Sequence, residues 1–235
     1  MEALYLEDSY LRTFEAMVEE TSGEYVVLDR TAFYPQSGGQ PHDQGTLVRD
    51  GEEFPVIYVG VFGEKISHDV KTQGLAAGDI VVGTLDWDRR YLFMRSHTAC
   101  HILSAVIYGV AGAKITGNQI GETRSRVDFS LQDFDREKLA GYVEKVNLII
   151  EEDRPVRTSV LSHEEALEVP ELIRLAKGMP DRDEVRIVEI DGVDVQACGG
   201  THVKRTCEIG RVEMLKAQNK GKANRRIYFG LVGGD

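Results

Sequence analysis

Residues 96–103 are Ser96-His97-Thr98-Ala99-Cys100-His101-Ile102-Leu103, and the sequence pattern of the chain changes near this stretch. On its N-terminal side, short runs rich in β-branched and aromatic residues are separated by turn signals. On its C-terminal side, apolar residues at helical spacing alternate with further strand-like runs. We therefore predict an α+β protein, with a small N-terminal β-barrel over residues 1–88 and an α/β domain with a mainly antiparallel sheet over residues 89–235.

The barrel prediction depends on the even spacing of its strand-like runs, which is typical of small closed sheets. A glycine-containing loop interrupts them between residues 33 and 45, where paired glycines permit positive φ angles and close approach of the backbone to another group. The predicted strands are Tyr25–Leu28, Pro55–Val61, Ile66–Val70 and Ile80–Leu85.

The second domain is predicted to begin with a helix that has Ser96 as its N-cap and ends near Gly109 and Gly112. An S-x-x-E capping box at Ser162 and Glu165 predicts a short helix. The other expected elements are strands at 113–120 and 124–129, an amphipathic helix at 135–151, and strands between 185 and 232.

Composition excludes several classes of protein. Of the 235 residues, 42% are hydrophobic and 29% are charged, which is the balance of a folded globular chain. No run approaches the ~20 apolar residues of a membrane span, and the acidic N-terminus is unlike a secretion signal. Three cysteines, an odd number, favour a reducing compartment, so we expect a cytoplasmic protein that has no membrane partner.

The charge distribution indicates one kind of partner. The net charge of −11 argues against indiscriminate nucleic-acid binding, and DNA is not expected. Residues 203–226 nevertheless contain eight basic residues and only two acidic ones. This segment is either a solvated basic face or a surface that binds one polyanion. We expect RNA contacts from Lys220, Lys222, Arg225 and Arg226 in and beside its glycine-containing turn.

Two pairs of metal-ligating residues carry the chemistry. His97 and His101 are four residues apart, so a helix places both imidazoles on one face. The first helical turn, where we expect His97, also favours the neutral imidazole that binds metal. Cys198 and His202 offer a thiolate and a third imidazole across a Gly-Gly turn. This set of soft and borderline ligands predicts one Zn²⁺ per chain.

The role of the zinc stays open at this point. Thr98 occupies the position at which a zinc peptidase would carry a glutamate base. Four protein ligands are typical of a structural site, whereas catalysis needs one ligand to give way to water or substrate. No general base is marked by the sequence, and Asp43 is the carboxylate nearest to a motif.

These motifs, in this order, resemble the editing domain of alanyl-tRNA synthetases over nearly the whole chain. They comprise His97–His101, Gln196–Val203 and Glu208-Ile209-Gly210, and the loop Tyr34–Gln40 is similar to the glycine-rich motif of the preceding barrel. The chain has no room for an aminoacylation domain, so it is most similar to the free-standing, medium-length alanyl-tRNA editing proteins.

The resemblance implies hydrolysis of tRNA(Ala) that carries serine, and glycine as a second possibility, by a zinc-dependent aminoacyl-tRNA hydrolase that spares alanyl-tRNA. It implies zinc ligation by the four residues named above and associates Gly38 and Gly39 with serine preference. Cys100 and Ile115 depart from the synthetase pattern, which leaves the pocket's details open. The candidates for reading the seryl hydroxyl are Gln36, Gln40, Thr116, Asn118 and Thr201.

Two other functions stay open. A structural-zinc RNA-binding module would keep the ligands and the basic segment but would not catalyse hydrolysis. A zinc hydrolase of a small ester or amide would not need the basic segment. An editing hydrolase is favoured because a mostly apolar aminoacylation site can discriminate serine from alanine by only about 1–3 kcal/mol, since the two differ by one hydroxyl. A second, hydrolytic selection step is therefore necessary.

Overall fold

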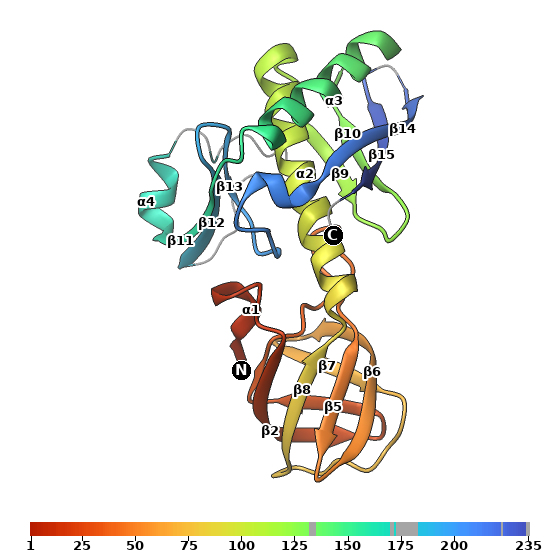
Figure 1. Ribbon diagram of the computed structural model, residues 1–235. Helices are drawn as coiled ribbons and strands as arrows, with labels where there is room; N and C mark the ends of the chain where they lie inside the picture. The colour runs from red at the N-terminus through yellow and green to blue at the C-terminus, as the bar shows by residue number, and fades with distance from the viewer. Residues whose placement is uncertain (132–134, 170–171, 173–182, 222, 234–235) are drawn as a thin grey trace. The chain divides into compact units, whose positions relative to one another are not determined.

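The computed structural model describes residues 1–131, 135–169, 172, 183–221 and 223–233. The chain divides into two compact units, Met1–Met94 and Arg95–Asp235 (Figure 1). The expected boundary at residue 88 falls inside helix α2 (Trp87–Ala111). None of the described helices combines the length and the apolar character that crossing a bilayer would require.

The first unit contains a closed barrel in the strand order β2-β3-β7-β6-β5-β8. Every pairing in it is antiparallel, and alternate residues point inward, as the burial of Val81 and Leu85 in β8 shows. The expected closed barrel is confirmed. Its strands are β2 (Thr13–Ser22), β3 (Tyr25–Leu28), β5 (Gly45–Arg49), β6 (Glu52–Phe62), β7 (Lys65–Val70) and β8 (Ile80–Leu85). A short parallel pair, β1 (Glu2–Ala3) with β4 (Arg30–Thr31), and helix α1 (Leu4–Glu7) complete the unit.

The loop between β4 and β5 is held by a buried ion pair. The side chains of Asp43 and Arg90 are both fully buried, and the Arg90 Nε lies 3.1 and 3.0 Å from the two carboxylate oxygens. The Tyr34 backbone N–H donates to the same carboxylate at 2.6 Å, and Arg90 also donates to the Ser9 carbonyl at 2.8 Å. The start of α2 is therefore part of the core of the first unit.

The second unit contains two antiparallel sheets (Figure 1). Four strands lie in the order β14-β15-β10-β9, and three lie in the order β11-β12-β13. The mainly antiparallel prediction is confirmed. The strands are β9 (Ile115–Gln119), β10 (Ser125–Phe129), β11 (Val156–Ser162), β12 (Glu184–Ile190), β13 (Asp194–Ala197), β14 (Arg211–Asn219) and β15 (Arg225–Val232).

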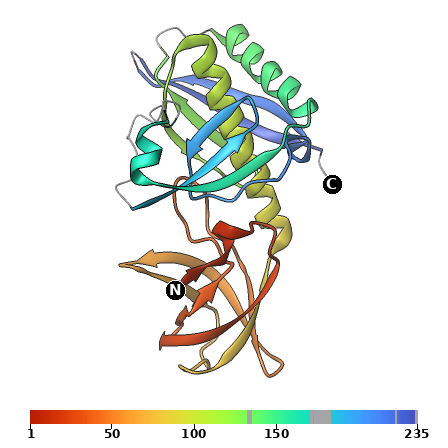
Figure 2. The ribbon, with the colours of Figure 1, turned by 90° about the vertical axis from the view of Figure 1, so that its left-hand side faces the viewer.

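Helix α3 (Arg136–Glu151) packs against β14 (Figure 2). Asp135 caps its N-terminus by accepting the backbone N–H groups of residues 137 and 138. The buried Asn147 side chain bonds both backbone groups of Val212, donating to its carbonyl at 3.0 Å and accepting from its N–H at 2.9 Å. The amphipathic helix predicted at 135–151 is confirmed, as is the Ser162–Glu165 capping box of α4 (His163–Leu167).

Helix α2 begins ten residues earlier than the sequence analysis predicts. Its first residue is Trp87, so Ser96 lies in its interior and is not an N-cap. The cap is Asp86, whose carboxylate accepts the backbone N–H of Arg89 at 3.2 Å and whose carbonyl accepts that of Arg90 at 3.0 Å. Aspartate is a preferred N-cap residue, and this signal was available in the sequence.

Candidate metal centre

Four side chains of the second unit converge on one point. His97 and His101 come from α2, and Cys198 and His202 follow β13. Their ligand atoms all lie within 4.8 Å of one another. The Cys198 Sγ is 3.6 Å from the His97 Nε2 and 3.4 Å from the His202 Nε2. A tetrahedral zinc with bonds of about 2.0–2.3 Å keeps its ligand atoms roughly 3.3–3.6 Å apart, so this donor set fits the ion.

Backbone contacts fix the loop that carries the second ligand pair. The Cys198 N–H donates to the Arg186 carbonyl at 3.0 Å, which extends the pairing of β12 and β13. The Arg186 guanidinium also donates hydrogen bonds to the carbonyls of Cys198 and Gly200, at 2.8 and 2.9 Å. The Gly200 N–H points to the Cys198 Sγ at 3.4 Å, and such a donor stabilises a thiolate.

A second layer of residues orients two of the imidazoles. The His101 Nδ1 lies 3.1 Å from the Asp194 Oδ2, and the His202 Nδ1 lies 3.1 Å from the Thr98 Oγ1. Thr98 also accepts the Val203 backbone N–H at 3.3 Å. A ring whose Nδ1 is held in this way presents Nε2 to a metal. Thr98, noted in the sequence only because it is not a glutamate, therefore orients a ligand, and Asp194 was missed because no motif marks it.

Electrostatics favours the ligating form of the cysteine. Burial alone would raise the pKa of the Cys198 thiol, but the neighbouring imidazoles outweigh it and hold that pKa well below its usual value. Burial works against charge on His101 too, yet the Cys198 thiolate and Asp194 raise its pKa to about 10. Without metal the site therefore holds a thiolate beside an imidazolium, and metal binding must displace the His101 proton.

The expected dipole contribution at His97 is wrong. Because α2 begins at Trp87, His97 is in the helix interior and not in its first turn, where the backbone partial charge would act. The ring is held by burial, with 5% of the residue exposed, and by the two other imidazoles, whose ring centroids lie 5.2 and 4.4 Å away.

The glycine-rich loop belongs to the first unit. Gly38 and Gly39 have φ values of 56° and 86°, and the backbones of Ser37 and Gln40 bond each other on either side of them. Within its own unit, nothing lies within 4 Å of the place where a Gly38 Cβ would stand. The positive φ angles explain both glycines. Gln40 is buried, whereas Gln36 is exposed.

Asp43 is not available as a general base. Its carboxylate is fully buried in the first unit and is held by Arg90 and by the backbone N–H of Tyr34. The structure does not support the sequence suggestion for Asp43, because both carboxylate oxygens already accept hydrogen bonds from Arg90 and the side chain is enclosed away from water.

Three predicted pocket residues lie in the second unit. Thr201 is fully buried in the loop between Cys198 and His202. Thr116 is exposed on β9, and its hydroxyl donates to the Asn224 side chain at 3.4 Å. Asn118 is half-buried on the same strand, and it pairs with Val127 of β10.

The predicted RNA contacts in the basic segment differ in their surroundings. Lys220 is exposed, and Lys222 lies outside the described residues. Arg225 is buried, and its guanidinium donates to the carbonyls of Gly221 and Asn224 at 2.6 and 3.0 Å, which fixes the β14–β15 turn. Arg226 lies in β15 and is ion-paired with a carboxylate of β10.

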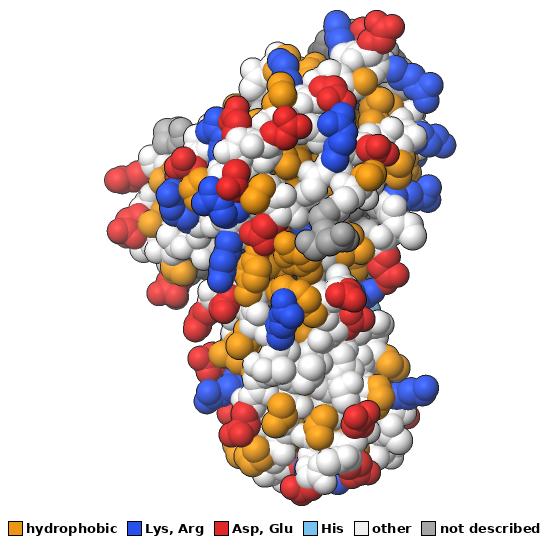
Figure 3. Space-filling view, in the orientation of Figure 1, with side chains coloured by type: hydrophobic (Ala, Val, Ile, Leu, Met, Phe, Trp, Pro, Cys, Tyr) orange, Lys and Arg blue, Asp and Glu red, His pale blue; other side chains and the backbone are white. Residues whose placement is uncertain are grey.

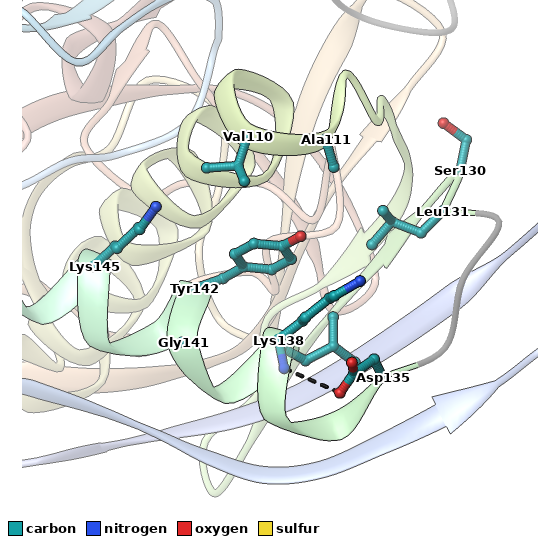
Figure 4. A pocket seen from close by; sticks show the side chains of 10 residues that line it. Val110, Ala111, Ser130, Leu131, Asp135, Lys138, Gly141, Tyr142 and Lys145 are labelled. Carbon is teal, nitrogen blue, oxygen red and sulfur yellow. Dashed lines mark hydrogen bonds between the residues drawn. The ribbon is translucent and has the colours of Figure 1, made fainter.

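A hollow of about 700 Å³ lies between the C-terminal end of α2 and helix α3 (Figure 4). Val110, Leu131 and Tyr142 give it an apolar side, and Lys138 and Lys145 border it. None of the four clustered ligands lines this hollow.

Comparison with known proteins places the chain among synthetase relatives. The family model described as "tRNA synthetases class II (A)" matches residues 6–89, and the "Threonyl and Alanyl tRNA synthetase second additional domain" matches residues 185–228. The chain is 39% identical to the alanine--tRNA ligase of Pyrococcus abyssi over 96% of its own length and 25% of the ligase. The chain therefore belongs to a class of proteins that are related in sequence to part of alanyl-tRNA synthetase.

Full-length relatives define the family. The alanyl-tRNA editing protein AlaX-M of Methanosarcina acetivorans is 54% identical over 98% of this chain and 99% of that protein. The AlaX-M protein of Saccharolobus solfataricus is 44% identical over 97% of this chain and 98% of that protein. The chain belongs to the AlaX-M family of alanyl-tRNA editing proteins, which confirms the resemblance found in the sequence.

Proposed function

We propose that the protein is a zinc-dependent hydrolase that removes serine from wrongly charged tRNA(Ala) and spares Ala-tRNA(Ala). The observation that carries the proposal is the convergence of His97, His101, Cys198 and His202 at zinc-ligand spacing in a chain of the editing family. Removal of glycine from tRNA(Ala) is the second activity proposed for the same site.

The reaction adds water across an ester. Water attacks the carbonyl carbon, the bond from that carbon to the ribose oxygen breaks, and a proton passes to the ribose oxygen, which yields free serine and uncharged tRNA. Zinc held by the four ligands would supply a Lewis acid that polarises the carbonyl or lowers the pKa of a water. The thiolate of Cys198 and the imidazoles of His97, His101 and His202 would hold that ion. Asp194 and Thr98 hold the Nδ1 sides of His101 and His202, which would leave the Nε2 atoms of these two rings for it.

Serine selection needs a polar group that can hydrogen-bond the seryl hydroxyl, which alanine lacks. Thr201 is supported best as this group. It is fully buried, it carries a hydroxyl, and it lies in the short loop between Cys198 and His202. We also propose Thr116 and Asn118, which lie in the same unit as Thr201, as pocket residues. Gly38, Gly39 and Gln40 belong to the first unit and stay predictions of the sequence analysis. Thr201→Val is expected to lower the ratio of Ser-tRNA(Ala) to Ala-tRNA(Ala) hydrolysis, and Asn118→Ala serves as the comparison within the pocket.

A structural-zinc RNA-binding module is the second candidate, and one observation favours it: four protein ligands fill the tetrahedron of a structural zinc. Deacylation of Ser-tRNA(Ala), Ala-tRNA(Ala) and Ser-tRNA(Ser) separates the two candidates. We expect about one zinc per chain, fast hydrolysis of Ser-tRNA(Ala) alone, and loss of both metal and activity in Cys198→Ala. Cys100→Ala, which changes a buried thiol outside the ligand set, is the matched control.

Three results would contradict the editing proposal. Bound zinc without hydrolysis of any of the three tRNAs would indicate the binding module. Hydrolysis of small seryl esters as fast as Ser-tRNA(Ala) would indicate a general esterase. Full activity in Cys198→Ala without metal would remove zinc from the reaction.

A further inference from the structure

The face of the four-stranded sheet that is turned away from its buried side chains carries mostly polar side chains. Strand register places Gln119, Arg126, Tyr228 and Lys216 in one row across β9, β10, β15 and β14. The next row is Gly117, Asp128, Arg226 and Gln218. Residues that alternate with these, such as Val127 and Ile227, are fully buried. We call this surface the arginine face, and Arg124, in the turn before β10, belongs to it.

A hollow of about 370 Å³ opens on the arginine face. Its charged lining residues are all arginines, Arg124, Arg126 and Arg226, and Tyr228 and Gln119 also line it. Figure 3 shows Lys and Arg side chains along the edge of the second unit where β14 and β15 lie. The chain as a whole has a net charge of −11, so a surface of this sign is a local exception.

Asp128 orients two of the arginines but does not neutralise the group. Its carboxylate accepts from Arg126 Nη1 at 2.7 Å and from Arg226 Nε and Nη2 at 2.6 and 2.8 Å. Arg126 Nε also donates to the Gln119 side chain at 3.0 Å. Within this group, three guanidinium charges face the one carboxylate of Asp128, which leaves about two positive charges. The carboxylate of Glu213 follows one row further along the same face, opposite Gly230. In the part of the chain that the structure describes, Arg124 has no carboxylate partner.

Tyr228 holds the group together. The Arg124 Cζ lies 5.1 Å and the Arg226 Cζ 5.8 Å from the centroid of the Tyr228 ring, and Arg226 Nη1 donates to the Tyr228 hydroxyl at 3.3 Å. Stacking on an aromatic ring fixes the plane of a guanidinium, and a planar fork of N–H donors is suited to the oxygens of a phosphate. The arginines are therefore preorganised before any ligand binds.

The extent of the surface favours a polymer over a small anion. The two rows cross all four strands, and Lys216, Gln218 and Gln119 extend the donors well beyond one phosphate. Sugar–phosphate backbones are bound by arginines, amides and aromatic rings of this kind.

We propose that the arginine face binds the sugar–phosphate backbone of the tRNA, and that the phosphates are contacted by Arg124, Arg126, Arg226 and Lys216. This inference rests on the proposed function for the identity of the RNA. It keeps Arg226 from the RNA contacts predicted in the sequence analysis and adds Arg124, Arg126 and Lys216 on the sheet surface beside the β14–β15 turn.

Binding of uncharged tRNA(Ala) to the full chain tests the inference, with the dissociation constant measured over a series of salt concentrations. The variants are Arg124→Gln and Lys216→Gln. Arg157→Gln, an exposed arginine on β11 of the other sheet, is the matched control. Each lost phosphate contact should reduce the slope of log K against log salt by about 0.7–0.9. We expect each variant to weaken binding about threefold to fivefold at roughly 0.1 M salt, while zinc content and the control's slope stay unchanged.

Arg124→Lys keeps the positive charge but removes the planar guanidinium. We expect this variant to keep the wild-type salt slope and to bind tRNA more weakly than wild type. The inference would be overturned if the slopes of log K against log salt for Arg124→Gln and Lys216→Gln equalled those of wild type and of Arg157→Gln. Competition by millimolar inorganic phosphate as effective as that of an RNA oligonucleotide would indicate a small-anion site and would also overturn it. A wild type that fails to hydrolyse Ser-tRNA(Ala), while Arg124→Gln still weakens tRNA binding, would refute the proposed function and leave this inference standing.

Discussion

Replacing Asp194 by asparagine is expected to weaken zinc binding about 10–100-fold, which corresponds to about 1.4–2.8 kcal/mol. The Asp194 Oδ2 lies 3.1 Å from the His101 Nδ1, and the carboxylate side chain is fully buried, so solvent does not screen the contact. Asparagine has the same shape, but its amide can donate to Nδ1 and so favour the tautomer that carries its proton on Nε2. That tautomer cannot ligate through Nε2.

The assay is a competition titration of the metal-free protein with zinc and a chelator of known affinity, at constant pH. Asp191→Asn is the matched control, because Asp191 precedes Asp194 by three residues in the β12–β13 connection but is exposed and paired with Arg157. We expect the control to bind zinc like wild type. A zinc affinity of Asp194→Asn within about threefold of wild type would refute the argument that the second layer orients His101.

Three further predictions concern stability and reactivity. Arg90→Met should lower the free energy of unfolding, measured in urea titrations, by about 3–5 kcal/mol, because it leaves the Asp43 carboxylate buried and unpaired. A loss no larger than that of the exposed Arg30→Met control would contradict this prediction. Burial lowers the pKa of His68 to about 4, so the unfolded chain takes up this proton first as the pH falls below about 6.5. Stability contributed by neutral His68 is thus present above pH 6.5 and is lost toward pH 4, by about 2 kcal/mol at pH 5, and a His68→Gln variant that keeps the same pH dependence would refute the assignment. In metal-free protein, iodoacetamide should label Cys198 before the exposed Cys207, because the pKa of the Cys198 thiol is lowered, whereas that of Cys207 is raised by a hydrogen bond to an aspartate. Zinc should reverse this order, as read from peptide maps. Labelling of Cys198 that zinc does not change would contradict its role as a ligand.

The ligand pairs could be predicted because each one is local in sequence. Two histidines four residues apart on a helix are neighbours wherever the helix lies, and Cys198 and His202 are joined by one short loop. The start of α2 is harder to predict because Ser96 and Asp86 both have side chains suited to an N-cap, and only Asp86 caps the helix.

The second layer and the arginine face could not be predicted in this way. Asp194 reaches His101 only through the pairing of β12 with β13, and the two residues are 93 positions apart. Arg126 and Tyr228 become neighbours through the register of β10 with β15, which the charge count over residues 203–226 could not include. Contacts of this kind depend on strand register, and a single sequence specifies it only through a repeating pattern of two residues.

The buried Asp43–Arg90 pair determines where this protein can be divided. A fragment that ends at residue 88, as the change in sequence pattern would suggest, loses Arg90 and leaves the Asp43 carboxylate enclosed without its counter-charge. A fragment that extends through Met94 retains the guanidinium together with the first two turns of α2. The barrel should therefore be expressible by itself only in the longer form. A gene fusion or truncation in this family has to keep these helical residues with the barrel that precedes them.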